Sequence, residues 1–285
     1  MQILTTKQEV SRYVQACMGQ GKTIGLVPTM GALHAGHASL VRRAVSENDV
    51  CIVSVFVNPT QFNNAEDLAL YPRNLERDAE LLSSLGADFV FAPTPEEMYS
   101  KEEMSQPFAF DFQGLDQVME GKMRPGHFNG VVQIVSRLFY LIQPTRAYFG
   151  EKDFQQLAII RFMVNESELS STFAPMQIVG CPIVREESGL AMSSRNERLS
   201  KEEKVIAAGI YRTLRESLQW AKEMSVREVE QKVVNTIQAI DGLEVEYYEI
   251  VDKTTLQKTD SFTNAIGCAT VYCSKVRLID NIQYC

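Results

Sequence analysis

The chain has 285 residues, of which 45% are hydrophobic and 22% are charged. This composition is typical of a globular protein with a hydrophobic core, so we do not expect a largely disordered chain. The formal net charge is -8, and the sequence has no dense run of lysine and arginine. Proteins that bind nucleic acids usually carry a basic face, so we expect no nucleic-acid partner.

The N-terminus has no basic segment followed by an apolar stretch, and no later segment is apolar over a membrane-spanning length. We therefore expect a cytoplasmic protein with no membrane partner. The six cysteines form no Cys-x-x-Cys pair and no zinc pattern with histidine, which predicts free thiols in a reducing compartment. They are Cys17, Cys51, Cys181, Cys268, Cys273 and Cys285. Cys51 lies in an apolar run, where we expect it to be buried.

The first part of the chain alternates short apolar runs with segments of helical periodicity. We expect strands at residues 24–27, 50–57, 88–91, 147–149 and 176–179. Helices are expected between them, at residues 36–47, 74–85, 130–142 and 153–164. Strands that alternate with helices and are apolar throughout predict an α/β fold, with a Rossmann-like parallel sheet covered on both faces.

The pattern changes near residue 184. Ser200 followed by Glu203 predicts a capped helix that reaches about residue 224, and Ser225 followed by Glu228 predicts a second. Strand-like runs follow at residues 243–251 and 265–272. We therefore expect two domains, a Rossmann-like domain over residues 1–183 and a smaller C-terminal α+β domain over residues 184–285.

A segment near the N-terminus, Gly19-Gln-Gly-Lys-Thr23, resembles the end of a phosphate-binding P-loop. The full pattern requires glycine where this chain has Ala16, and it requires a strand before the loop and a helix after it. The expected strand instead begins at Ile24. We therefore interpret this segment as a helix end and a turn.

Two of the three histidines, His34 and His37, follow the strand that is expected from Ile24. They fall at the start of a helix, where free N–H groups and the helix dipole favour phosphate. His-x-Gly-His at this place resembles the signature of nucleotidyl-transferases, in which imidazoles donate hydrogen bonds to phosphate oxygens. The alternative interpretation is a pair of capping or surface histidines.

Further blocks of sequence accompany this motif, in the order Pro28-Thr-Met-Gly-Ala-Leu-His-Ala-Gly-His-Ala-Ser-Leu40, Val57-Asn-Pro-Thr-Gln-Phe62, Asp67-Leu-Ala-Leu-Tyr-Pro-Arg73, Arg124-Pro-Gly-His-Phe-Asn-Gly130, Gly150-Glu-Lys-Asp-Phe-Gln-Gln156 and Met192-Ser-Ser-Arg-Asn196. In their order and spacing these blocks resemble pantothenate synthetases over nearly the whole chain. The resemblance implies an ATP-dependent ligase that condenses (R)-pantoate with β-alanine through pantoyl-adenylate, releasing AMP and pyrophosphate. It also implies Mg²⁺ with the ATP, a homodimer, and a C-terminal domain that closes over the site as a lid.

The same resemblance assigns the site residues. It implies that four residues are catalytic: His34, His37, Lys152 and Arg195. The residues implied to bind ATP are Met30, Gly31, Ala32, Leu33, His34, Ala35, Gly36, His37, Gly150, Glu151, Lys152, Asp153, Val184, Met192, Ser193, Ser194 and Arg195. Gln61 and Gln156 are implied to bind pantoate. Ala35 and Ala38 stand where many family members have larger or charged residues, but they do not replace the histidines.

The chemistry of these side chains fits the implied roles. An amide such as that of Gln61 both donates and accepts hydrogen bonds, which suits the hydroxyls and carboxylate of pantoate. Lys152 supplies a compact positive charge for phosphate, and Asp153 suits a helix cap or the ribose hydroxyls. The alternatives are that Gln156 lies on the polar face of a helix, and that residues 150–153 are a capped helix start with a solvated lysine.

Arg195, His127 and Asp78 complete the set of interpreted residues. Arg195 suits a phosphate clamp, and its alternative is an exposed loop in which it pairs with Glu197 or Glu187. The resemblance implies that His127 shapes the pocket, with a catalytic role as the alternative, and Asp78 is a candidate for outer-shell contact with Mg²⁺.

Two other functions remain open from the sequence. One is a different His-x-Gly-His enzyme, a transferase that releases a stable nucleotide conjugate. The other is a catalytically silent nucleotide-binding or regulatory protein on the same fold. The glutamine blocks argue against the first, and the complete set of histidine, lysine, glutamine and arginine argues against the second.

Overall fold

The computed structural model describes residues 1–106 and 108–284, so Cys285 among the expected free thiols lies outside the described residues. The chain divides into two compact units. The first, called the N-terminal unit, comprises Met1–Asp116, Arg124–Glu151 and Gln156–Pro182. The second, called the C-terminal unit, comprises Gln117–Met123, Lys152–Gln155 and Ile183–Cys285.

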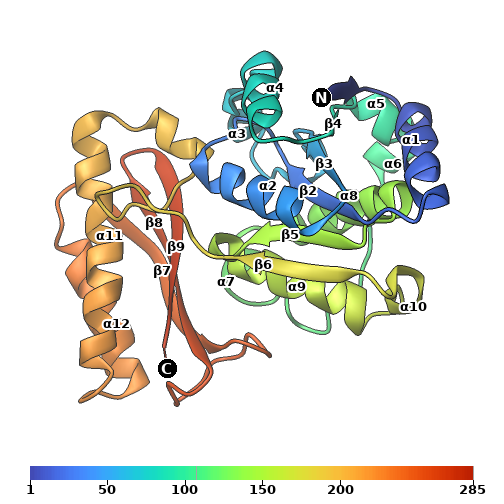
Figure 1. The fold of residues 1–285 in the computed structure, drawn as a ribbon. Coiled ribbons are helices and arrows are strands. Elements are labelled where there is room, and N and C mark those ends of the chain that lie inside the picture. Colours follow the sequence, from blue (N-terminus) through green and yellow to red (C-terminus); the bar gives the residue numbers. More distant parts are fainter. Residues whose placement is uncertain (107, 285) are drawn as a thin grey trace. The chain divides into compact units, whose positions relative to one another are not determined.

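The N-terminal unit is built on a six-stranded sheet in which every strand pair is parallel (Figure 1). Its strands are β1 (Gln2–Leu4), β2 (Ile24–Thr29), β3 (Val50–Val55), β4 (Phe89–Phe91), β5 (Arg146–Gly150) and β6 (Gln177–Cys181). Its longer helices are α1 (Lys7–Gly19), α2 (Ala35–Glu47), α4 (Leu75–Ser84), α8 (His127–Ile142) and α9 (Phe154–Asn165). Short helices α3 (Ala65–Leu70), α5 (Pro95–Met98), α6 (Lys101–Ser105) and α10 (Ser170–Phe173) complete it, with the 3₁₀ helix η1 (Pro59–Gln61).

The strand order is β1-β4-β3-β2-β5-β6. Strands β3 and β4 follow β2 in the chain and lie on one side of it in the sheet. Strand β5 comes next in the chain and lies on the other side of β2. Leu26 of β2 pairs with Ala147 of β5, so these two strands are neighbours at the point where the order reverses. In open α/β sheets, ligands bind at the carboxyl ends of the strands at such a reversal. The topology therefore indicates the loops after β2 and β5 as the expected place for a ligand.

Alternation along the strands divides the buried side chains between the two faces of the sheet. On β3, Val50 and Ile52 contribute to one hydrophobic cluster, whereas Cys51 and Val53 contribute to another. The first cluster contains side chains of α1, α8 and α9, and the second contains side chains of α2 and α4. Helices therefore cover both faces, which explains why the strands are apolar at successive positions.

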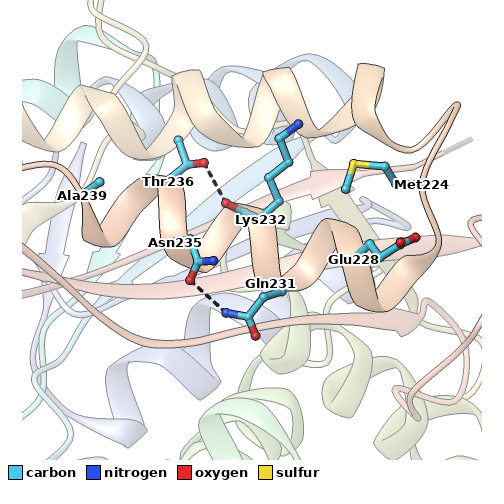
Figure 2. A pocket seen from close by; sticks show the side chains of 7 residues that line it. All are labelled: Met224, Glu228, Gln231, Lys232, Asn235, Thr236 and Ala239. Atoms are coloured by element: carbon cyan, nitrogen blue, oxygen red, sulfur yellow. Dashed lines mark hydrogen bonds between the residues drawn. The ribbon is translucent and has the colours of Figure 1, made fainter.

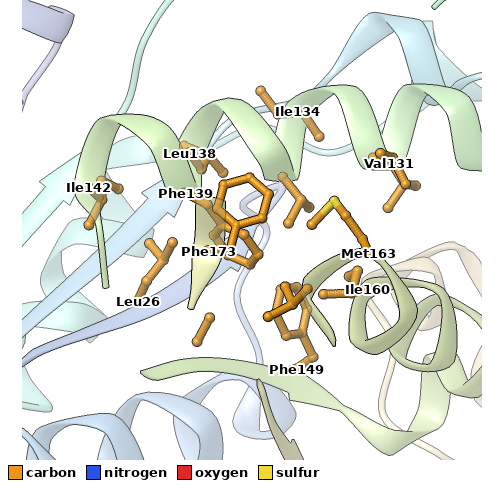
Figure 3. Close-up of a cluster of buried hydrophobic side chains, with 14 of the residues drawn as sticks. Leu26, Val131, Ile134, Leu138, Phe139, Ile142, Phe149, Ile160, Met163 and Phe173 are labelled. Carbon is orange, nitrogen blue, oxygen red and sulfur yellow. The ribbon is translucent and has the colours of Figure 1, made fainter. Parts of the chain in front are cut away.

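The larger cluster centres on aromatic side chains between α8, α9 and the sheet (Figure 3). The ring of Phe139 meets Phe149 edge-on with centroids 6.4 Å apart, and it meets Phe173 in the same way at 5.6 Å. Such edge-to-face pairs are favourable beyond the area they bury. They fix α8 against β5, which leads directly to one of the predicted motifs.

The expected fold class is confirmed, as are the five expected strands and four expected helices of this unit, within a few residues at their ends. The sequence analysis did not anticipate β1, and of α1 it anticipated only the C-terminal end, before the strand from Ile24. Helix α1 ends at Gly19 and β2 begins at Ile24, so the P-loop-like segment is a helix end and a turn. The expected burial of Cys51 is also confirmed. In the two described stretches, no helix has the length and hydrophobicity needed to cross a membrane.

The C-terminal unit contains an antiparallel sheet of β7 (Leu243–Asp252), β8 (Ala265–Cys273) and β9 (Val276–Gln283). Helices α11 (Lys201–Trp220) and α12 (Val226–Gln238) begin with the capping boxes expected at Ser200 and Ser225. Helix α11 ends four residues earlier than expected, and β9 was not anticipated. The unit also contains η2 (Glu151–Asp153) in part, η3 (Ser194–Arg198) and α7 (Met119–Met123).

One side chain attaches the segment Gln117–Met123 to this sheet. The carboxylate of Glu120 accepts two hydrogen bonds from the guanidinium of Arg277 on β9, at 2.7 and 2.8 Å. It also accepts from the hydroxyls of Tyr247 on β7 and Thr270 on β8, both at 2.9 Å. Arg277 also pairs with Glu246. Burial alone would lower the pKa of Arg277, but the two carboxylates raise it, so the guanidinium stays charged.

We expect Arg277→Met to destabilise the protein by about 3–5 kcal/mol, because it leaves two mostly buried carboxylates without their shared cation. Thermal or denaturant unfolding measures this change. Arg227→Met is the matched control, because Arg227 pairs with Asp260 at 3.8 Å on the surface, where both side chains are more than four-fifths exposed. A loss no larger than that of the control would contradict the structural role of the buried cluster.

Candidate active site

The loop after β2 is held in an unusual backbone conformation. Gly31 and Ala32 have positive φ angles of 79° and 50°. A side chain at Gly31 would begin 3.0 Å from a carboxylate oxygen of Asp78 and 3.1 Å from Val55, so glycine is required there. The buried carboxylate of Asp78 accepts from the backbone N–H groups of Ala32 and Leu33 at 2.9 and 2.8 Å. Helix α4 thereby fixes the loop that leads into α2.

His34 and His37 lie at the start of α2, with ring centroids 4.1 Å apart. His34 is the N-cap, and its Nδ1 accepts from the N–H of Gly36 at 3.1 Å. The Nδ1 of His37 accepts from the N–H of His34 at 3.3 Å. The capping interpretation of these histidines is therefore correct as a description of their local structure.

This capping also determines which ring nitrogen carries the proton. A backbone N–H can only donate, so the Nδ1 atoms of His34 and His37 must be the acceptors. In the neutral imidazole, the proton then lies on Nε2 of both rings. Both side chains therefore have an Nε2–H donor at the N-terminus of a helix, a place where the backbone and the helix dipole favour an anion.

Gln61 lies in η1, and its side chain is buried beside Met30 and Asn58. Burial raises the pKa of the Tyr99 hydroxyl to about 12, so this group donates, and it does so to Oδ1 of Asn58 at 2.7 Å. The Nδ2 of Asn58 therefore donates to Oε1 of Gln61 at 3.0 Å. The Nε2 of Gln61 donates to the sulfur of Met30 at 3.2 Å, a weak acceptor.

The backbone of Gln61 is held by α8 and the loop before it. The ring Nδ1 of His127 donates to the carbonyl oxygen of Gln61 at 2.8 Å, and Arg124 donates to the other ring nitrogen at 3.2 Å. Gly130 allows α8 to pack closely, because a side chain there would begin 2.4 Å from the carbonyl oxygen of Thr60. His127 thus supports Gln61 through its backbone, with the opposite tautomer to that of the other two histidines.

The second loop at the reversal of strand order follows β5. Gly150 is the last residue of β5, and Glu151 begins η2. Gln156 lies in the first turn of α9, where its side chain is partly exposed. Because β2 and β5 are neighbouring parallel strands, the loops after them leave the same edge of the sheet.

The remaining predicted residues belong to the C-terminal unit. The ammonium group of Lys152 donates to the carboxylate of Asp153 at 3.2 Å. Val184 and Met192 are joined by a hydrogen bond from the N–H of Met192 to the carbonyl oxygen of Val184, at 3.0 Å. The chain between them turns back on itself, so these two predicted residues lie side by side.

The motif after Met192 forms the start of η3. Ser193 caps this 3₁₀ helix, and its hydroxyl accepts from the N–H of Arg195 at 3.3 Å. Ser194 is buried, and the side chain of Arg195 is partly buried. Asn196 is also buried and donates to the carbonyl oxygen of Ala191 at 3.0 Å, which ties the motif to the preceding turn.

The structure therefore brings the predicted residues together in two groups. In the N-terminal unit, Met30 contacts Gln61, and the two histidines contact each other at the end of the same loop. In the C-terminal unit, the group is formed by Lys152, Asp153, Val184 and Met192–Arg195. Sequence reasoning missed Asn58 as the partner of Gln61, although it precedes Gln61 by three residues, and it missed that Asp78 holds the loop.

A pocket lies along α12 in the C-terminal unit (Figure 2). None of the residues that line it is a predicted site residue; they are Met224, Glu228, Gln231, Lys232, Asn235, Thr236 and Ala239. Two polar side chains of the pocket bond one turn along the helix, Gln231 to Asn235 and Thr236 to the backbone of Lys232. These are ordinary contacts of a helix surface, and we assign no ligand to this pocket.

Comparison with known proteins gives consistent results. Residues 2–283 match the family model described as pantoate-beta-alanine ligase. The chain is 58% identical to a pantothenate synthetase of Phocaeicola vulgatus, over 100% of this chain and 99% of that protein. The fold is similar to the crystal structure of pantothenate synthetase from Thermus thermophilus, with a TM-score of 0.90, 41% identity, and coverage of 99% of both chains.

A further similar structure is that of the pantoate-beta-alanine ligase from Francisella tularensis, complexed with beta-gamma ATP and beta-alanine. Its TM-score is 0.81 and its identity is 36%, over 99% of this chain and 97% of that chain. These matches extend over both units of the chain.

We expect Asp78→Asn to destabilise the protein by about 1–3 kcal/mol, because an amide accepts through one atom only and turns an N–H donor toward a backbone N–H. Equilibrium unfolding in denaturant measures the change. Glu80→Gln makes the same chemical change at an exposed position of α4 and is the control. Equal stability of the two variants would show that the loop does not depend on Asp78.

Proposed function

The chain belongs to the pantoate-beta-alanine ligase family and is an enzyme of that family, and from this premise we propose how it acts. It condenses (R)-pantoate with β-alanine in two steps, using ATP as co-substrate. The first step forms pantoyl-adenylate and releases pyrophosphate. The second forms pantothenate and releases AMP.

One observation carries this proposal. His34 and His37 hold their Nε2–H donors at the N-terminus of α2, at the carboxyl end of a strand where the strand order reverses. A phosphate placed there accepts hydrogen bonds from both rings and lies in the favourable field of the helix dipole. The proposed ATP contacts of Met30–His37 follow from this placement.

Pantoate is assigned to Gln61 and Gln156. The Nε2 of Gln61 donates to a thioether, which is a much weaker acceptor than a carboxylate or hydroxyl oxygen. A pantoate oxygen that replaces the sulfur therefore gains a stronger hydrogen bond with little loss. Asn58 fixes the orientation of the amide, so the donor is already directed before pantoate binds. The partly exposed amide of Gln156 supplies a second contact.

The remaining ATP contacts are assigned to two further segments. Gly150–Asp153 supplies the ammonium group of Lys152 for the phosphates. Val184 contacts the adenine through its backbone, and Met192–Arg195 supplies hydroxyls and a guanidinium for the triphosphate. We propose that residues 1–183 form the domain that binds ATP and pantoate, and that residues 184–285 act as a lid. A lid would keep water from the reactive adenylate.

The chemistry requires positioning and charge stabilisation without a covalent bond to the enzyme. A carboxylate oxygen of pantoate attacks the α-phosphorus of ATP, and the bond to the bridging oxygen breaks as pyrophosphate leaves. His34, His37, Lys152 and Arg195 stabilise the negative charge that develops on the phosphate oxygens. The amine of β-alanine then attacks the acyl carbon and loses a proton, and AMP leaves with the electrons of the acyl–oxygen bond.

We propose that Mg²⁺ accompanies the phosphates of ATP, since this ion usually reaches such sites with the nucleotide and keeps few protein ligands. Both oxygens of Asp78 accept backbone N–H groups of the loop, so its carboxylate is assigned to that structural task, and no protein ligand is assigned to the metal. The family resemblance further supports a homodimer in the cytoplasm. Sedimentation analysis of the purified chain tests the oligomeric state.

Release of AMP tests the proposed reaction. The purified protein is incubated with ATP and Mg²⁺, and with pantoate and β-alanine separately and together. We expect AMP in quantity only when both are present, and one equivalent of pyrophosphate in the first turnover with pantoate alone. Formation of a stable nucleotide conjugate would instead favour another His-x-Gly-His transferase, and ATP binding without any turnover would favour a silent binding protein.

We expect His37→Ala to lower the rate of adenylate formation by about 10²–10³-fold, because it removes one preorganised donor from the phosphate. Rapid-quench measurement of pyrophosphate in the first turnover gives this rate. His37→Gln keeps an N–H donor near the position of Nε2 and should retain more activity than the alanine variant. Arg42→Ala, at an exposed position of α2, is the control for the helix. A normal rate in His37→Ala would remove this residue from the mechanism.

We expect Gln61→Ala to raise the KM for pantoate by roughly 10-fold, which corresponds to the loss of one or two hydrogen bonds, and to leave the KM for ATP almost unchanged. Steady-state kinetics with each substrate varied in turn separates the two effects. Gln61→Glu should also weaken pantoate binding, because it replaces the donor with a charge that repels the pantoate carboxylate. An equal rise in both KM values would contradict the assigned contact.

A further inference from the structure

Two successive residues of β9, Asp280 and Asn281, are buried polar side chains that the proposed mechanism does not use. Asp280 forms a two-point ion pair with the guanidinium of Arg185, at 2.7 and 2.9 Å. The Arg185 guanidinium also lies 3.4 Å from the centroid of the Tyr211 ring on α11 and donates to the carbonyl oxygen of Gly189 at 3.2 Å. Arg185 is therefore fixed on several sides.

Fixing Arg185 also fixes the residues around it. Arg185 pairs with Ala191 as an isolated antiparallel bridge, and the adjacent Val184 and Met192 are joined by their backbone hydrogen bond. Asn196 binds the carbonyl oxygen of Ala191. The segment that carries the proposed adenine contact and the segment that carries the proposed triphosphate clamp thus form one small hairpin, and Asp280 anchors it to the sheet.

The side chain of Asn281 holds a different segment from the one that Asp280 holds. Its Nδ2 donates to the carbonyl oxygen of Lys152 at 3.1 Å. Successive side chains of a strand point to opposite faces of the sheet, which allows neighbouring residues to hold different segments. The two are also coupled, because a carboxylate oxygen of Asp280 accepts from the backbone N–H of Asn281 at 2.8 Å.

We propose that Asp280 and Asn281 are positioning residues that hold Lys152 and the Val184–Met192 hairpin in a fixed geometry relative to each other. This inference rests on the proposed function, since it assumes that Lys152 and Arg195 contact the phosphates. Neither positioning residue is assigned a contact with a substrate. Asp280 acts through Arg185, and Asn281 acts through the backbone of Lys152.

Charged groups that stabilise a reacting phosphate must be placed accurately, which is the physical reason why Lys152 and the hairpin need support. A displacement of about 1 Å in a charged group can cost on the order of 100-fold in rate. Lys152 lies in a short segment between β5 and α9, and the hairpin precedes η3. A strand of the sheet that binds both segments through buried side chains supplies the rigid support that loops of this kind lack.

A double-mutant cycle with Lys152 tests the proposal. Three variants of the full chain are prepared: Asn281→Ala, Lys152→Ala and the double variant. The rate of pyrophosphate formation in the first turnover is measured with ATP, Mg²⁺ and pantoate. We expect Asn281→Ala to lower this rate by roughly 10- to 100-fold. We expect the double variant to be no slower than Lys152→Ala, because the proposal assigns the effect of Asn281 on the rate to Lys152.

Two controls separate positioning from general instability. Gln283→Ala removes an exposed amide from the same strand and should keep the normal rate. Asn281→Asp keeps the size of the side chain but replaces the N–H donor, so it should lower the rate even if Asn281→Ala folds poorly. Unfolding curves of all variants identify those that are folded under the assay conditions.

Several results would overturn the proposal. One is a normal first-turnover rate in folded Asn281→Asp and Asn281→Ala. Another is a double variant whose loss equals the product of the two single losses, since Asn281 would then act independently of Lys152. A normal rate in Lys152→Ala alone would show that the assigned role of Lys152 is wrong, and the inference would fail with it. Because that variant is measured separately, this failure is distinct from a failure of Asn281.

Discussion

The pairing of β2 with β5 is the constraint on which the N-terminal unit depends. Leu26 and Ala147 lie far apart in the sequence, yet they are neighbours in the sheet. Because the pairing is parallel, the two loops that follow these strands leave from the same edge. One of these loops carries His34 and His37, and the other follows Gly150, the last residue of β5. A reversal of strand order at any other place would separate these motifs, however well each one formed locally.

Carboxylates that are buried or mostly buried recur where a loop or segment must be held. Asp78 binds two backbone N–H groups, and Asp280 binds Arg185. Glu120 binds Arg277 and two hydroxyls in the same manner. A buried charge is costly unless its hydrogen bonds are satisfied, so each of these side chains tolerates few alternative arrangements. The histidines show the same dependence on partners, since His34 and His37 accept through Nδ1 whereas His127 donates through it.

The sequence by itself determined the features that depend on near neighbours. The box from Ser200 to Glu203 spans three residues, and the apolar runs of β2 and β3 have the pattern of strands buried on both faces. It also determined the family, because several short blocks occur together in a fixed order. Strand β9 was missed because Asp280 interrupts its apolar alternation, and that same aspartate anchors the hairpin.

Only the tertiary structure decided how distant polar groups combine. Arg185 and Asp280 are 95 residues apart, Lys152 and Asn281 are 129 apart, and Glu120 and Arg277 are 157 apart. Local propensity has no information about such pairs, since each forms only after the strands between them have found their register. The sequence identified which residues have suitable chemistry, and the packing of the sheets decided which of them meet.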